Sequence, residues 1–223
     1  MVTPESRGRL LTPGGEVGST RIQPKAAVAT LVVAHGAGAG MDHPFLVGFC
    51  RAMGEAEVST LRFNFPYVER GRRSPDPERV LRQTWLAAFE DASRDGTRPV
   101  LAGGKSLGGR IASMCVADGM PAAGLVFLGY PLHPPGRTDR LRAEHLGRIE
   151  VPILFLQGSR DPFARPDLLA GVLGGLGDRA TLVSIDGGDH SFRVRGHRAD
   201  DRTIGAALAG EAAPYVRRVA GAR

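Results

Sequence analysis

Three side chains that together can carry out acyl transfer follow three separate apolar runs of the sequence. In chain order they are Ser106, Asp161 and His190. A serine hydroxyl is a weak nucleophile at neutral pH, so we expect His190 to accept its proton. Asp161 would then fix the tautomer of the imidazole and stabilise the imidazolium that forms. We therefore predict Ser106, Asp161 and His190 as catalytic residues.

The segment from 100 to 110 predicts a tight turn that leads from a strand into a helix. It contains Gly104-x-Ser106-x-Gly108 after an apolar run, a pattern typical of a nucleophilic serine. A side chain at Gly104 or Gly108 would crowd this turn, which places Ser106 in strained backbone angles. The N–H of Leu107 would begin the helix and point at an oxyanion on the attacked carbonyl. The alternative interpretation is that the glycines only allow the helix to pack closely on the strand.

Nucleotide-binding patterns are excluded at both glycine-rich segments. A phosphate-binding loop that ends in Gly104-Lys105-Ser106 would need glycine where Pro99 stands. The segment 35–40 lacks the dinucleotide fingerprint, because Met41 and His43 occupy positions that require glycine. We interpret this segment as a flexible loop at the carboxyl end of a central strand, where α/β sheets bind ligands.

The predicted catalytic residues and their neighbours also have simpler interpretations. Asp161 precedes a proline and could initiate a turn, and His190 could be a hydrogen-bonded loop residue. Asp189 could orient the imidazole instead of Asp161, but the side chains of neighbouring residues tend to point apart. Lys105 is compatible with a serine–lysine hydrolase, yet adjacent side chains diverge in such a turn, so we expect it to be structural.

The remaining histidines show no spacing that would hold a metal ion together with carboxylates. We therefore predict neither a metal nor any other cofactor. We expect His35 to brace its loop and His43 to lie at the start of a helix. His133, His145 and His197 fall in segments without evident partners.

Length and composition indicate one α/β domain over residues 1–223, with a core large enough to fold alone. The net charge is +6. However, the arginine clusters at 70–73 and 193–198 have no interleaved aromatic residues on which nucleic-acid bases could stack. We therefore expect a solvated basic surface and no nucleic-acid partner.

Cysteine usage and hydropathy predict a cytoplasmic protein. Cys50 and Cys115 are expected to lie far apart and buried in helices, as is typical of a reducing compartment. No signal peptide is visible, and no apolar run approaches the ~18–20 residues that a membrane span requires. We therefore predict no association with a membrane.

Apolar runs alternate with helical patterns, which predicts a doubly wound, mostly parallel sheet with helices on both faces. Residues 1–26 form an N-terminal hairpin region, and further strands are expected at 27–34, 59–65, 100–103, 125–130, 152–157 and 180–185. Helices are expected at 42–54, 76–95, 107–118, 166–176 and from 201 onward. Asp42 would cap the first helix, and Pro214 would kink or split the last. Residues 131–150 form a short excursion with a short helix at 139–146.

The chain order Ser106, Asp161, His190 is that of the α/β hydrolases and differs from the orders in chymotrypsin and subtilisin. From about residue 27 onward the sequence resembles this superfamily, and it is most similar to the small lidless branch of dienelactone-hydrolase-like proteins. The segments that carry the resemblance are His35-Gly36-Ala37-Gly38, Arg62-Phe63-Asn64-Phe65-Pro66-Tyr67, Gly104-Lys105-Ser106-Leu107-Gly108-Gly109, Gln157-Gly158-x-x-Asp161-Pro162 and Asp189-His190.

The resemblance implies an α/β-hydrolase fold with a minimal or absent lid, and an oxyanion hole formed by the N–H groups of Leu107 and Ala37. Dienelactone hydrolases have a cysteine where this chain has Ser106, which argues against their substrate. Larger relatives insert a lid where this chain has only the excursion 131–150. An open site for small or exposed acyl groups follows.

Three residues at strand ends are candidate pocket walls. They are Phe65, Tyr67 and His133, and plain packing beneath the loops is the alternative interpretation.

Together these features predict a serine hydrolase that cleaves carboxylic esters or related acyl bonds through an acyl intermediate on Ser106. One alternative is a non-catalytic interaction module, because the same branch is similar to hydrolase-like domains of chromatin-associated complexes. Another is an acyltransferase, which would use the same triad and pass the acyl group to an acceptor other than water. Nucleic-acid binding through the basic surface is the weakest alternative.

Overall fold

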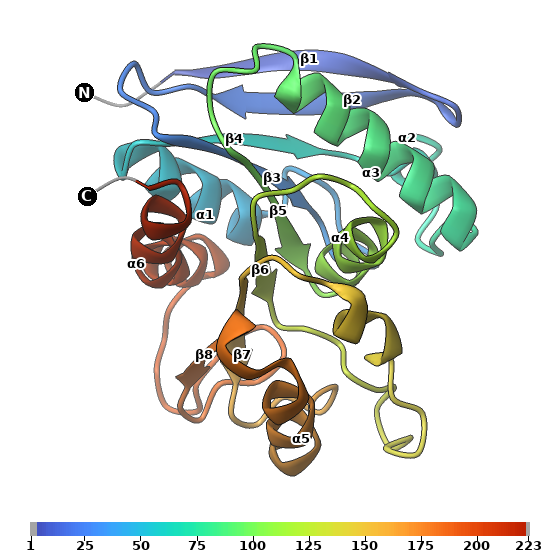
Figure 1. The fold of residues 1–223 in the computed structure, drawn as a ribbon, viewed down its shortest axis with the longest axis vertical. Helices are drawn as coiled ribbons and strands as arrows, with labels where there is room; N and C mark the ends of the chain where they lie inside the picture. The colour runs from blue at the N-terminus through green and yellow to red at the C-terminus, as the bar shows by residue number, and fades with distance from the viewer. Residues whose placement is uncertain (1–3, 222–223) are drawn as a thin grey trace.

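The computed structural model describes residues 4–221, and its centre is one twisted sheet (Figure 1). The order of the strands across the sheet is β1-β2-β4-β3-β5-β6-β7-β8. The strands are β1 (Glu5–Thr12), β2 (Gly15–Ile22), β3 (Ala29–Ala34), β4 (Val58–Phe63), β5 (Val100–Lys105), β6 (Leu125–Leu128), β7 (Ile153–Gly158) and β8 (Ala180–Ile185).

The sheet is parallel from β4 to β8 and antiparallel at its N-terminal edge. β1 and β2 form the expected hairpin, and β2 pairs antiparallel with β4. Every residue of β3, β4, β6 and β7 is buried, as is typical of central strands covered on both faces, and in β4 this includes the polar Ser59, Thr60 and Arg62. The predicted doubly wound sheet is therefore confirmed.

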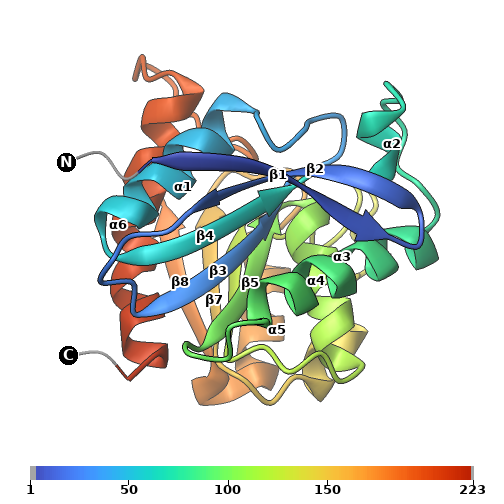
Figure 2. The same cartoon turned by 90° about the horizontal axis from the view of Figure 1, so that it is seen from above.

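Helices cover both faces of the sheet (Figure 2). On one face lie α1 (Pro44–Glu55) and α6 (Asp201–Val219), which bury Phe49 and Val216. On the other lie α3 (Glu78–Ser93), α4 (Leu107–Ala117) and α5 (Pro166–Leu176), and this layer contains Trp85. Among residues 4–221, no helix is long and apolar enough to cross a membrane.

Four elements differ from their predictions. His43, not Asp42, caps α1, because its side chain accepts a hydrogen bond from the N–H of Phe45. A short helix, α2 (Pro66–Glu69), lies between the expected strand at 59–65 and the expected helix at 76–95, where no helix was predicted, and a proline suits the first position of a helix. The excursion contains only the 3-10 helix η1 (Glu144–Arg148) in place of the helix expected at 139–146.

The fourth difference concerns Pro214, which does not split the last helix, one of the two effects expected of it. α6 runs without interruption from Asp201 to Val219, with Pro214 on its exposed side. The backbone carbonyl that a proline leaves unpaired one turn earlier can there be hydrogen-bonded by water.

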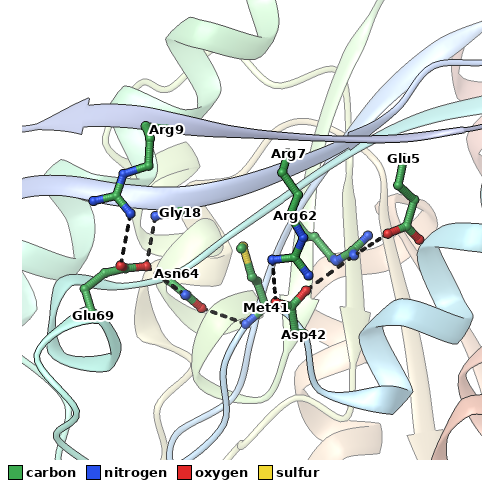
Figure 3. A network of polar contacts seen from close by, with 9 residues as sticks. All are labelled: Glu5, Arg7, Arg9, Gly18, Met41, Asp42, Arg62, Asn64 and Glu69. Carbon is green, nitrogen blue, oxygen red and sulfur yellow. Dashed lines mark hydrogen bonds and ion pairs between the residues drawn. The ribbon is translucent and has the colours of Figure 1, made fainter.

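A polar network ties the N-terminal hairpin to the loop that follows β3 (Figure 3). Asp42, in this loop, pairs with Arg7 of β1 at 2.9 Å and with the buried Arg62 of β4 at 3.5 Å. Asn64 accepts a hydrogen bond of 2.7 Å from the N–H of Met41 and donates one of 2.8 Å to Glu69. The loop after β3 is therefore held by β1 and β4 through Asp42, and by Asn64 through the N–H of Met41.

Candidate active site

The structure brings Ser106, His190 and Asp161 into one hydrogen-bonded chain. His190 Nε2 lies 2.9 Å from Ser106 Oγ, and His190 Nδ1 lies 2.7 Å from Asp161 Oδ2. Ser106 follows β5, Asp161 follows β7 and His190 follows β8. The carboxyl ends of parallel strands meet at one edge of the sheet, which is why residues so far apart in the chain converge.

Ser106 occupies the strained turn that the glycines predict. Its φ is 49°, and it occupies the position before the first residue of α4 without a capping hydrogen bond from its side chain. A Cβ atom at Gly104 would lie 2.4 Å from the carbonyl oxygen of Ala34, and one at Gly108 would lie 2.3 Å from the same oxygen. Leu107 is the first residue of the helix, so its N–H has no acceptor within the helix and is free to bind another group.

Asp161 is 4% exposed and is surrounded by donors. Gln157 Nε2 donates to Oδ2 at 2.5 Å, and the N–H of Phe163 donates to Oδ1 at 2.8 Å. The carboxylate therefore accepts from Nδ1–H of His190, which leaves Nε2 to accept the proton of Ser106. Gln157 also accepts from the N–H of Tyr130, so this side chain positions Asp161, a role that the sequence interpretation missed.

Asp189 has a different task from the one considered as an alternative. Its Oδ1 accepts hydrogen bonds from the N–H groups of Ser191 at 2.8 Å and Arg193 at 2.9 Å. These bonds shape the loop that carries His190 and leave Asp161 as the partner of the imidazole.

His35 braces the loop after β3, as expected. Burial lowers its pKa to about 4, so the ring is neutral near pH 7. Nδ1–H donates to the carbonyl of Gly36 at 2.8 Å, and Nε2 accepts from the N–H of Phe65 at 3.1 Å. This loop lies directly against the turn, since a Cβ at Gly36 would be 3.6 Å from Cβ of Ser106. Ala37 follows and lines the pocket in front of the serine.

The prediction that Phe65, Tyr67 and His133 form pocket walls is wrong. Phe65 and Tyr67 are both 0% exposed, and their rings pack around His35 beneath the loop. His133 is 2% exposed, and its Nε2 accepts from the N–H of Arg165. All three follow strand ends, but each side chain is buried, as the packing interpretation predicts.

The pocket beside Ser106 has a volume of about 400 Å³. Its apolar walls include Phe45 and Leu46 of α1 and Phe163, whose ring centroid lies 4.3 Å from that of His190. The other lining residues are His35, Gly36, Ala37, Ala39, His43, Lys105, Leu107, Arg110, Pro131, Arg142, Ser191, Arg193 and Asp201. The sequence offered one local signal for these walls, namely the position of Phe163 directly after Asp161-Pro162.

Two histidines that were expected to lack partners have them. His133 Nε2 accepts a hydrogen bond from the N–H of Arg165, and His145 Nε2 lies 2.7 Å from Ser113 Oγ. Burial lowers the pKa of His145 to about 4, which keeps this ring neutral as well. Within residues 4–221, no group of three or more His, Cys, Asp and Glu side chains could hold a metal ion.

Solved structures with the same fold cover almost the whole chain. A serine hydrolase without a lid from Xanthomonas campestris matches with a TM-score of 0.75 and 21% identity, over 98% of this chain and 96% of that one. A dienelactone hydrolase from Anabaena variabilis matches with a TM-score of 0.76 and 18% identity, over 98% and 99%. The esterase domain of a Rhodothermus marinus protein matches with a TM-score of 0.70 and 16% identity, over 95% and 98%.

A family model assigns the sequence to a protein family more directly than these structural matches do. The model described as "Alpha/beta hydrolase domain" matches residues 27–216, which contain every strand from β3 to β8 and all three residues of the hydrogen-bonded chain. The protein therefore belongs to the alpha/beta hydrolase domain family.

Proposed function

We propose that this protein is a serine hydrolase that cleaves carboxylic esters through an acyl intermediate on Ser106. The observation that carries the proposal is the continuous chain from Ser106 Oγ through His190 to the buried Asp161, at 2.9 and 2.7 Å. Hydrogen-bond contact between nucleophile and base, with a third group orienting the base, is the geometry that activates a serine.

The proposed reaction has two halves. Ser106 Oγ attacks the ester carbonyl carbon while His190 Nε2 accepts the hydroxyl proton. The N–H groups of Ala37 and Leu107 stabilise the oxyanion of the tetrahedral intermediate. When the intermediate collapses, the carbon–oxygen bond to the alcohol breaks and His190 returns the proton to the departing oxygen. Water then attacks the acyl-serine with His190 as base, releases the acid and regenerates Ser106.

Small-molecule esters with short acyl groups are the proposed substrates. The pocket of about 400 Å³ lies near the lower end of the range of ligand sites, and aromatic and aliphatic side chains form much of its wall. An esterase domain is among the proteins of the same fold. The reaction uses side chains of this chain and water, and we propose no nucleic-acid or membrane partner.

We place the protein in the cytoplasm as part of the same proposal. Cys50 and Cys115 are both buried and unpaired, and they are the two cysteines of the chain. Buried free thiols are typical of a reducing compartment.

The test is labelling by a fluorophosphonate probe together with turnover of p-nitrophenyl acetate and butyrate. We expect the wild type to be labelled and active, and Ser106→Ala to lose both while it keeps the circular dichroism spectrum of the wild type. A well-folded wild type that neither labels nor turns over would refute the proposal and favour an interaction module. Product analysis with added alcohols separates hydrolysis from acyl transfer.

A further inference from the structure

Lys105 connects the two strained turns of the candidate active site. It directly precedes Ser106, whose φ is 49°, and its Nζ donates a hydrogen bond of 2.6 Å to the main-chain carbonyl of His190. Phe192, in the same loop as His190, has a φ of 63°. Positive φ is costly for residues other than glycine and persists only where the surroundings enforce it. The bond from Lys105 therefore joins the two turns.

The loop that carries His190 lies at the margin of the sheet, so its position depends on contacts with other elements. It follows β8, which is an edge strand of the sheet and contains only exposed and half-buried residues. The bonds that the N–H groups of Ser191 and Arg193 donate to Asp189 lie within the loop, so they set its shape but not its position relative to Ser106. Phe192 stacks on Phe45 of α1, and Lys105 joins the loop to β5 in the middle of the sheet.

The surroundings of Lys105 favour the charged amine despite burial. Nζ lies 5.5 Å from the centroid of the Phe192 ring, in a cation–π arrangement. Burial lowers the pKa of Lys105 to about 8, and the carboxylates of Asp161 and Asp189 oppose this shift. The other titratable groups nearby are His190 and His35. The loop that contains His35 packs at Gly36 against the aliphatic part of the Lys105 side chain. Below pH 8 the ammonium is thus the main form.

We propose that Lys105 is a positioning residue, whose ammonium holds the main chain of His190 against the turn after β5 and so keeps the imidazole aligned with Ser106. The inference rests on the proposed serine hydrolysis. It assigns a role to the residue before the nucleophile. The side chain of Lys105 is directed to the His190 main chain and acts on the reaction through that contact.

Two variants separate positioning from simple packing. Lys105→Met keeps the apolar stem but removes the charge and the donor, and Lys105→Arg keeps both. At pH 7 we expect Lys105→Met to lower kcat for p-nitrophenyl butyrate by roughly tenfold or more, with KM within about twofold, because misalignment affects the chemical step more than binding. Lys105→Arg should restore most of kcat. Equal kcat values for Lys105→Met and the wild type would overturn the inference.

The pH profile gives a readout that packing would not move. The ammonium is present below about pH 8 and is lost as pH rises through that value. The wild-type kcat/KM should therefore decline above about pH 8, and Lys105→Met should be low and free of this decline. If Lys105→Met does not fold, the pH dependence of the wild type alone tests the inference. A rate of fluorophosphonate labelling that stays constant to about pH 9.5, at constant circular dichroism, would overturn the inference.

Failure of this inference differs from failure of the proposed function. A wild type that neither labels nor turns over ester would refute the function. A labelled and active wild type beside an equally active Lys105→Met would refute only the role of Lys105.

Discussion

Two carboxylates lie close to His190, and their surroundings separate their roles. Asp161 is buried, bonds to Nδ1 and is held by Gln157 and the N–H of Phe163. Asp189 bonds to two N–H groups of its own loop. Because Nδ1 must keep its proton for Nε2 to act as a base, only the residue bonded to Nδ1 can control the tautomer.

A matched pair of variants tests this division. Asp161→Asn should lower kcat by about 10³–10⁴-fold, because an amide can force the wrong imidazole tautomer. Asp189→Asn keeps an oxygen acceptor for Ser191 and Arg193, so its kcat should stay within about fivefold of the wild type. Turnover of p-nitrophenyl butyrate at pH 7 measures both. Comparable losses in the two variants would contradict the assignment of Asp161.

At the scale of elements, the contact between α1 and α6 places one wall of the pocket. A Cβ at Gly48 of α1 would lie 2.0 Å from the carbonyl oxygen of Arg202, and a Cβ at Gly205 of α6 would lie 2.0 Å from that of Phe45. Both glycines are needed for the two backbones to approach so closely. Phe45 and Leu46, at the start of α1, reach the pocket because of this contact.

Gly205→Ala should therefore destabilise the protein. The clash is with backbone that cannot move aside easily, so we expect a loss of about 1–3 kcal/mol in the free energy of unfolding. For a chain of this length the Tm should fall by about 3–10 °C in calorimetry. The control is Gly171→Ala in α5, where nothing lies within 4 Å of the added Cβ. This second variant should raise the Tm slightly, since alanine favours a helix. A Gly205→Ala protein as stable as the wild type would disprove the close contact.

At the scale of the whole molecule, the entrance of the pocket has no large covering element among the described residues. The only helix in the connection from β6 to β7 is the short η1. This connection contributes Pro131 and Arg142 to the lining of the pocket. The basic surface is partly neutralised within the chain. Asp76 pairs with Arg70 and Arg72, and Arg193 pairs with Asp201 at 2.7 Å. Both features agree with a small substrate that enters from solvent.

An enzyme without a lid should show no activation at a lipid–water interface. We expect the rate on tributyrin to rise smoothly with concentration and to level off, without a jump where the ester exceeds its solubility. Turnover of p-nitrophenyl butyrate should exceed that of the dodecanoate by roughly tenfold or more, because the pocket is small. A sharp increase at the solubility limit would show that an element of the chain opens over the site.

Local patterns were enough to predict most strands, helices and the edge of the sheet at which the site lies. Apolar runs, prolines and glycines act over a few residues, so the ends of β5, β7 and β8 could be placed closely, and with them Ser106, Asp161 and His190. The errors were at helix starts and in the excursion, as at Asp42, where ion pairs with Arg7 and Arg62 compete with capping.

The walls of the pocket were decided by packing between distant segments. Phe65 and Tyr67 follow the end of β4 as Ser106 follows the end of β5, yet their rings pack on His35 in the core. Phe45 and Leu46 line the pocket because α6, more than 140 residues later in the chain, fixes the position of α1. Side-chain direction at a strand end and contact between remote helices depend on neighbours that no local pattern contains. The sequence therefore indicated the chemistry of the site, whereas only the folded arrangement determined the shape of its pocket.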